Sequence, residues 1–184
     1  MSIAPAWECQ RSVEVEVPVA FAWAHMTDIR NWNDPPAEFA VEGPFVEGTR
    51  GTTQMPGQPL ASWTIRDVEP GRGYTIEGGS FFERAVILVH WRFDPLSERT
   101  ARLTQRMELL GENAAAYVDE IKSIFEPNME PGMRRIAQMM ERAKAGAGAT
   151  SRACTGRKCT KRSQTIMLQC VPGRYGHRSR GQVR

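Results

Sequence analysis

The stretch FERAVILVHWRFDPLSERTARLTQRMELL, residues 82–110, contains two apolar runs that alternate with polar residues and are separated by Asp94-Pro95. A period of two residues is typical of a β-strand with one buried face. The turn signal between the runs predicts that the two strands pair as an antiparallel hairpin. The side chains expected on its dry face are Ala85, Ile87, Val89, Trp91 and Phe93 in the first strand, and Ala101, Leu103, Gln105, Met107 and Leu109 in the second.

Similar alternation precedes this hairpin and predicts an antiparallel meander. Residues 19–27, VAFAWAHMT, interrupt it as a short apolar helix, and Pro18 suits the first turn of that helix because a missing N–H costs nothing there. Turn residues, mostly Gly and Pro, separate the alternating segments. Further strands are expected at residues 7–17, 38–43, 49–55, 60–68 and 73–78.

After Gly111 the apolar period changes from two residues to that of a helix. Pro127 and Pro131 interrupt this helical pattern, so one kinked helix and two abutting helices both satisfy it. Residues 145–148, AGAG, indicate a helix end and a linker. The expected apolar stripe consists of Ala114, Tyr117, Val118, Ile121, Ile124 and Phe125, continued by Met133, Ile136, Ala137 and Met140.

Charge divides the chain into two parts. All 21 Asp and Glu lie between Glu8 and Glu141, whereas residues 146–184 carry nine Lys or Arg and no acid. The small net charge of +3 is therefore a cancellation between an acidic body and a basic tail. We expect residues 1–145 to form one folded domain and residues 146–184 a disordered basic tail, because the tail has too few apolar residues to offset the entropy lost on ordering.

The body gives no sign of secretion or of a membrane span. Its only cysteine, Cys9, has no partner for an intradomain disulfide, which fits a reducing compartment. The N-terminus lacks the apolar core of a signal peptide, and no apolar run reaches the roughly 18–20 residues that cross a bilayer. The sequence therefore predicts a cytoplasmic protein without a membrane span.

The tail offers weak alternatives to disorder. Cys154, Cys159, Cys170 and His177 are chemically suitable zinc ligands, but their spacing lacks a Cys-x2-Cys knuckle, so we expect no metal site. Basic charge attracts nucleic acid, yet Tyr175 is the only aromatic residue in the tail, which argues against a nucleic-acid partner. A shifted reading frame or an unselected extension would also produce such a composition.

The run PVAFAWAHMTDIRNW, residues 18–32, adds more specific information. It resembles the helix-and-loop signature of the START-like superfamily (SRPBCC), which includes polyketide cyclase/dehydrase-like proteins. Gly48-Thr49-Arg50-Gly51 and residues 65–71, IRDVEPG, are similar to the next strands of that superfamily. The resemblance covers about residues 7–144 and implies an α+β helix-grip fold, in which a curved antiparallel sheet wraps around a long C-terminal helix and an apolar cavity.

A cavity between that sheet and helix would be lined mainly by apolar side chains, which is typical of small-ligand pockets. Plain core packing fits the same stripes equally well. We expect no cofactor, and neither the ligand nor the oligomeric state follows from the sequence. The candidate ligand-binding residues are Trp63, Ile76, Ile87, Val89, Trp91, Leu103, Gln105, Met107, Tyr117, Ile121 and Met133, with Ile65 and Met140 beside them.

No catalytic residue can be assigned from these patterns. Cyclase or dehydratase chemistry needs a base and a donor to an enolate oxygen, and Gln105, Tyr74 and Tyr117 are the candidate donors. Alternation places His90 on the face opposite Trp91, and a lone histidine such as His25 is more often structural. These residues form no recognisable catalytic set.

Two functional hypotheses remain. The first is binding of a small hydrophobic or aromatic molecule in the interior, with or without cyclase- or dehydratase-like turnover. The alternative is a non-catalytic module that uses the same fold to bind a protein. The volume of the interior discriminates between them, because ligand pockets typically occupy about 300–1,000 Å³.

Overall fold

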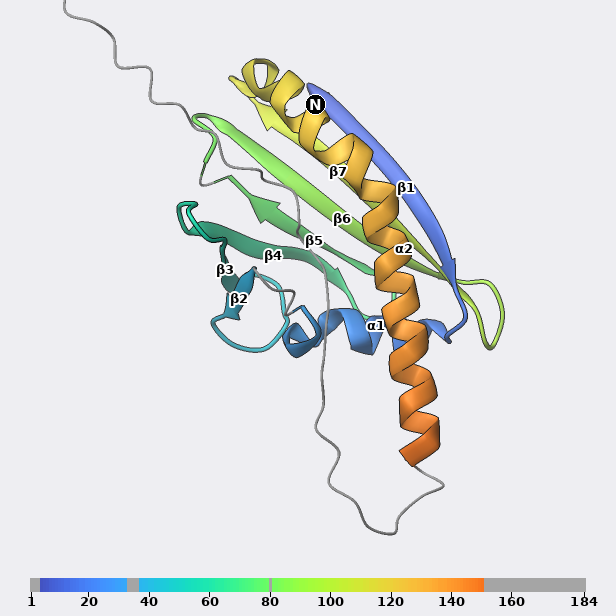
Figure 1. Ribbon diagram of the computed structural model, residues 1–184. Helices are drawn as coiled ribbons and strands as arrows, with labels where there is room; N and C mark the ends of the chain where they lie inside the picture. Colours follow the sequence, from blue (N-terminus) through green and yellow to red (C-terminus); the bar gives the residue numbers. More distant parts are fainter. Residues whose placement is uncertain (1–3, 33–36, 80, 151–184) are drawn as a thin grey trace, which may run out of the picture.

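The computed structural model describes residues 4–32, 37–79 and 81–150, with side chains described as far as residue 147 (Figure 1). The strands, a short helix and a long helix follow one another in the expected order. The elements are β1 (Trp7–Val15), α1 (Val19–Thr27), the 3-10 turn η1 (Ile29–Asn31), β2 (Glu38–Val41), β3 (Arg50–Gln54), β4 (Ala61–Glu69), β5 (Gly73–Gly78), β6 (Ala85–Pro95), β7 (Ala101–Gly111), η2 (Ala114–Tyr117) and α2 (Val118–Thr150).

The strands form one seven-stranded antiparallel sheet in the order β1-β7-β6-β5-β4-β3-β2. Only β1 departs from the simple meander, because it pairs with β7 at the far edge. Figure 1 shows the sheet curving around α2, which crosses its inner face. The α+β helix-grip architecture that the sequence predicts is thereby confirmed.

The pairing of β6 with β7 sets the two faces of the sheet. Val89 lies opposite Met107 and Trp91 opposite Gln105. Val89, Trp91 and Met107 are buried against the core, as their period of two predicts. The outer face instead carries ion pairs such as Arg102–Glu14.

α2 is one continuous helix through both prolines. A proline inside a helix leaves a carbonyl one turn earlier without its N–H partner. For Pro127 that carbonyl belongs to Ser123, and the next carbonyl, that of Ile124, accepts a hydrogen bond of 2.7 Å from the Asn128 side-chain amide. The structure thus favours a single helix over two abutting ones, and burial of one face outweighs the cost of the prolines. The buried side chains of α2 are Ile121, Ile124, Met129, Met133, Ile136, Ala137 and Met140.

The helix also extends further than its sequence indicates. The sequence predicts a helix end at residues 145–148, but α2 continues to Thr150. A glycine inside a helix costs only about 1 kcal/mol relative to alanine, and here glycine alternates with alanine, the strongest helix former. The AGAG segment is therefore helical, and the prediction that it forms a linker is wrong.

Because neighbouring strands are antiparallel, successive connections lie alternately at the two ends of the sheet. The β3–β4 loop, the β5–β6 loop and the start of α2 meet at one end, which we call the cavity end. The turns β4–β5 and β6–β7, the β2–β3 loop and α1 lie at the other end, which we call the α1 end. This sorting decides which loops can enclose space together.

Candidate functional site

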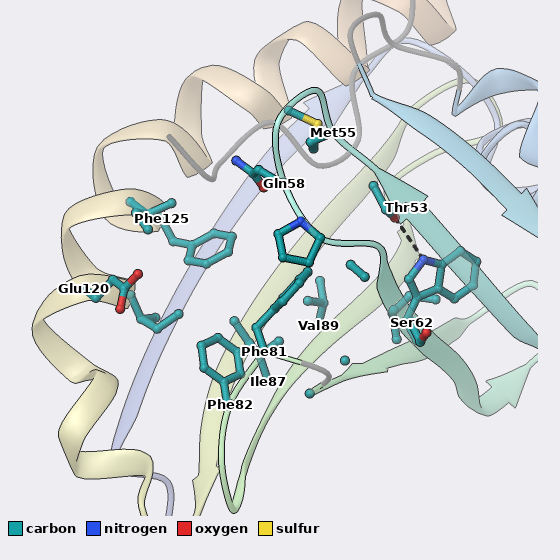
Figure 2. Close-up of a pocket in the computed structure, with 18 residues that line it drawn as sticks. Thr53, Met55, Gln58, Ser62, Phe81, Phe82, Ile87, Val89, Glu120 and Phe125 are labelled. Atoms are coloured by element: carbon teal, nitrogen blue, oxygen red, sulfur yellow. Dashed lines mark hydrogen bonds between the residues drawn. The ribbon is translucent and has the colours of Figure 1, made fainter. Parts of the chain in front are cut away.

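A cavity of about 130 Å³ lies at the cavity end of the sheet, between the two hairpin loops and the first turns of α2. Figure 2 shows Phe125 on the helix facing the loop that carries Met55 and Gln58, with Phe81 and Phe82 on the neighbouring loop. The described residues that line it are Thr53, Met55, Gln58, Pro59, Ala61, Ser62, Trp63, Ile76, Gly78, Gly79, Phe81, Phe82, Ile87, Val89, Glu120, Ile121, Ile124 and Phe125.

The walls are largely apolar, with a few polar groups. The Trp63 indole Nε1–H donates a hydrogen bond of 3.0 Å to Thr53 Oγ1, so both polar atoms are satisfied. Glu120 is exposed and is the only ionisable side chain among the described residues that line the cavity. The cavity therefore suits an apolar molecule, with polar contact available at its rim.

Close approach of two strands fixes the position of Trp63. Gly51 on β3 lies directly opposite Trp63 on β4. A Cβ at position 51 would lie only 2.1 Å from the Trp63 ring, so the ring packs on the bare backbone of Gly51. The absence of a side chain at position 51 lets the indole lie between the sheet and the cavity.

The structure gathers only part of the predicted ligand-binding set around this cavity. Five of the eleven candidates line it, namely Trp63, Ile76, Ile87, Val89 and Ile121. The others lie elsewhere in the interior. Trp91, Leu103, Met107 and Met133 are buried in the core, whereas Gln105 and Tyr117 are half-buried.

Several lining residues were not predicted because they lie in loops. The sequence predicts strands that include Met55 and Phe82, but β3 ends at Gln54 and β6 begins at Ala85. Met55, Phe81 and Phe82 therefore lie in loops, where alternation does not indicate which side chains face the interior. The predicted meander could have indicated these residues, because every second hairpin loop of a meander lies at the same end of the sheet. Apolar residues in the β3–β4 and β5–β6 loops are therefore expected to meet there.

An aromatic cluster fills the interior between the cavity and the α1 end. Its ring centroids are 4.8–6.1 Å apart, and most of its pairs meet edge to face, which is the favourable geometry for aromatic rings. Among these rings, burial raises the pKa of Tyr74 above its ordinary value, which keeps the phenol neutral. The cluster comprises Trp23, Trp32, Phe39, Phe45, Trp63, Tyr74 and Phe93.

The other polar candidates have identifiable partners or positions. The Tyr117 hydroxyl accepts a hydrogen bond of 3.0 Å from the backbone N–H of Glu83, and its ring contacts Phe82 at the cavity wall. Gln105 lies on the inner face of β7 opposite Trp91 and away from the cavity. Tyr117 therefore supports the β5–β6 loop, while Gln105 does not line the cavity.

The histidines lie away from the cavity. His90 is on the outer face, where Nδ1 lies 2.9 Å from Thr75 Oγ1 and Nε2 lies 2.9 Å from Glu108 Oε2. His25 on α1 stacks on Phe21, and burial lowers the pKa of its imidazole. Neither side chain lines the cavity, so neither can transfer a proton to a molecule bound there.

A second hollow, of about 660 Å³, opens at the α1 end around the β4–β5 and β6–β7 turns. Charged residues border it, including Arg92, whose guanidinium pairs with Asp94 at 2.9 Å. Exposed, paired charges of this kind contribute little binding energy. The apolar cavity is therefore the better candidate site.

No group of three or more side chains suited to a metal ion occurs within the described ranges. The chemically suitable zinc ligands of the tail lie outside those ranges, namely Cys154, Cys159, Cys170 and His177. None of the helices in the described part of the chain combines the length and the apolar character needed to cross a bilayer.

Solved structures with similar folds include two enzymes. A point mutant of norcoclaurine synthase from Thalictrum flavum, in complex with a transition-state analogue, superposes with a TM-score of 0.60 at 12% identity, covering 75% of this chain and 96% of that one. The Zhui aromatase/cyclase from a Streptomyces species gives 0.58 at 16% identity, covering 77% and 98%. A protein from Nitrosomonas europaea gives 0.56 at 15% identity, covering 80% and 99%. These likenesses are evidence of a shared fold.

The sequence itself carries the assignment to a family. A comparison with curated proteins gives no significant match. The model of one family, described as polyketide cyclase / dehydrase and lipid transport, matches residues 6–141, which span the whole sheet and most of α2. With the sheet gripping α2 as the sequence resemblance implied, the chain belongs to the polyketide cyclase/dehydrase and lipid transport family.

Proposed function

We propose that the protein binds a small apolar molecule, about the size of one aromatic ring, in the cavity at the cavity end. The observation that carries this proposal is a partly open cavity of about 130 Å³ whose walls are largely apolar. The exposed Glu120 provides a polar group at its rim. Membership of a family named for cyclases, dehydrases and lipid transport supports the same conclusion.

The size of the cavity limits the ligand. An apolar cavity of about 150 Å³ stays dry and accepts a benzene-sized molecule. Pockets for drug-sized ligands occupy about 300–1,000 Å³. At about 130 Å³, this cavity suits a single ring or a short aliphatic chain. This volume lies below the range for drug-sized ligands, so volume does not decide against the alternative of a protein-interaction module. The largely apolar walls are what favours binding of a small molecule.

Filling the cavity tests the proposal. Val89 is 6% exposed and lines the cavity from the inner face of β6. We expect Val89→Phe to occupy the space and to weaken toluene binding at least tenfold. Titration with toluene, followed by the chemical shifts of the cavity-lining methyl groups, measures this affinity. Overpacking costs about 1–3 kcal/mol, so retention of the fold is checked by thermal unfolding.

Val86→Phe is the matched control. Val86 lies on the same strand but faces outward, between Ile87 and Ala85, and does not line the cavity. This variant should bind toluene as the unmodified protein does. Equal toluene affinity in Val89→Phe and Val86→Phe would place the binding elsewhere, and failure of toluene to bind at millimolar concentration would refute the proposal.

Turnover of a cyclase or dehydratase type is a further step within this proposal. Such chemistry requires a base near the bound molecule, and Glu120 is the carboxylate among the described lining residues. Glu120 also lies in the first turn of α2, where a negative charge stabilises the helix dipole. Because this structural role already explains the residue, the cavity supports binding more strongly than turnover.

A further inference from the structure

The aromatic cluster contains one buried polar atom that has no partner among the described residues. Tyr74 is 2% exposed, and its hydroxyl forms no hydrogen bond with any of the described residues. Leaving a buried hydroxyl unpaired costs about as much as losing a hydrogen bond, and such groups are rare in proteins. A phenylalanine would fill the same position without that cost. The presence of tyrosine is therefore explained if its hydroxyl forms a hydrogen bond with a bound molecule.

The neighbouring polar atoms of the cluster are satisfied. The Trp32 indole N–H donates a hydrogen bond of 2.7 Å to the carbonyl of Met26. The Trp63 indole N–H donates one of 3.0 Å to Thr53 Oγ1. Tyr74 is thus the exception within a cluster that otherwise pairs its buried polar groups.

Phe45 is a half-buried ring of the cluster that comes from a loop and contacts Tyr74. Its centroid lies 4.8 Å from that of Tyr74 and 5.8 Å from that of Trp32, so it fills the space between them. It comes from the β2–β3 loop, is only half-buried, and has exposed neighbours in Pro44 and Val46. By contrast, Trp32 is 1% exposed and Tyr74 lies within a central strand.

We infer that Phe45 occupies a second ligand subsite, and that an aromatic molecule carrying a hydroxyl or carbonyl oxygen replaces its ring there. When the ring of the ligand replaces the ring of Phe45, the buried aromatic area stays about the same. The ligand oxygen adds the hydrogen bond that Tyr74 lacks. This subsite is separate from the 130 Å³ cavity, because neither Phe45 nor Tyr74 lines that cavity.

Phenol and toluene are probes of equal ring size that differ in hydrogen bonding. In full-length Phe45→Ala, where the ring is removed, we expect phenol to bind at least tenfold more tightly than it does to the unmodified protein. Adding Tyr74→Phe should weaken phenol binding about tenfold and leave toluene binding within about twofold, because only phenol loses a hydrogen bond. Calorimetric titration of each variant with each probe measures these ratios.

Stability provides a readout that does not depend on any ligand. Tyr74→Phe should leave the unfolding temperature unchanged or raise it, because the hydroxyl has no hydrogen bond to lose among the described residues. Tyr117→Phe is the matched control, because its hydroxyl accepts a hydrogen bond from Glu83. Tyr117→Phe should unfold at a lower temperature than the unmodified protein. When it is combined with Phe45→Ala, the protein should keep the preference for phenol over toluene.

Two results would overturn the inference. One is a drop in unfolding temperature for Tyr74→Phe as large as that for Tyr117→Phe, which would reveal a partner within the protein or a trapped water. The other is phenol binding that Tyr74→Phe does not weaken. Failure of toluene to bind at the cavity end would change neither the unfolding temperature of Tyr74→Phe nor the effect of Tyr74→Phe on phenol binding. The inference and the proposed function can therefore be refuted independently.

Discussion

At the scale of single residues, Trp91 illustrates how a core position and a pocket wall can look alike in a sequence. Its place in the alternating run of β6 predicts an inward-facing side chain, and the structure buries it to 4% exposure. Alternation also predicts the outward position of His90, which the bonds to Thr75 and Glu108 confirm. The facing of a strand residue is thus readable from the sequence, whereas contact with a cavity is not.

Trp91→Ala should destabilise the protein by about 3–5 kcal/mol, because it deletes a large buried ring that lies opposite Tyr74 and Gln105. The free energy of unfolding from urea titration measures this change. Trp91→Phe retains most of the buried volume and should cost less. A Trp91→Ala protein that keeps its stability but binds ligand more weakly would instead make Trp91 part of a binding site.

At the scale of elements, the contact between β3 and β4 shapes the wall of the cavity. The ring of Trp63 lies flat on Gly51, and its N–H is tied to Thr53 at the next position of β3 that faces the same side. Side-chain periodicity alone does not indicate this contact, because a glycine contributes nothing to an apolar stripe. The wall therefore depends on the absence of a side chain.

Gly51→Ala should destabilise the protein by about 1–3 kcal/mol, because the new Cβ would lie 2.1 Å from the Trp63 ring and force it to move. The shift of the Trp63 indole N–H signal in NMR spectra reports the movement, and thermal unfolding reports the cost. Gly132→Ala is the control. The nearest atom to its Cβ would be 3.9 Å away, so it should be neutral or stabilise α2 by up to about 1 kcal/mol.

At the scale of the whole molecule, charge separates the acidic body from the basic end of the chain. All nine Lys and Arg that follow residue 144 also follow Thr150, the last residue of α2. The core of the body is closed by α2, whose buried side chains end with Met140. We predict that residues 151–184 contribute nothing to the stability of this core.

Removal of residues 151–184 should shift the unfolding temperature by less than about 2 °C, which corresponds to roughly 1 kcal/mol or less for a domain of this size. Differential scanning calorimetry of the shortened and full-length proteins measures the shift. Removal of residues 136–184 is the control. It also deletes Ile136, Ala137 and Met140 from the core and should lower the unfolding temperature strongly. A drop of many degrees in the first variant would show that the basic segment belongs to the folded domain.

The sequence by itself determined the order of the elements, the faces of the sheet and the family. These follow from local periods, such as the alternation around Trp91, and from the run at residues 18–32. Continuity of α2 through Pro127 and the extension of the helix to Thr150 required the structure, because burial and propensity compete there.

Tertiary structure alone decided where the cavity lies. Phe81 and Met55 come from separate loops, and their meeting depends on long-range pairing rather than on any local period. The same holds for Tyr74, whose hydroxyl has no partner among the described residues and whose ring packs against Phe45 from a distant loop. Local sequence patterns fix which side of an element is buried, but the packing of distant segments determines which buried positions enclose space.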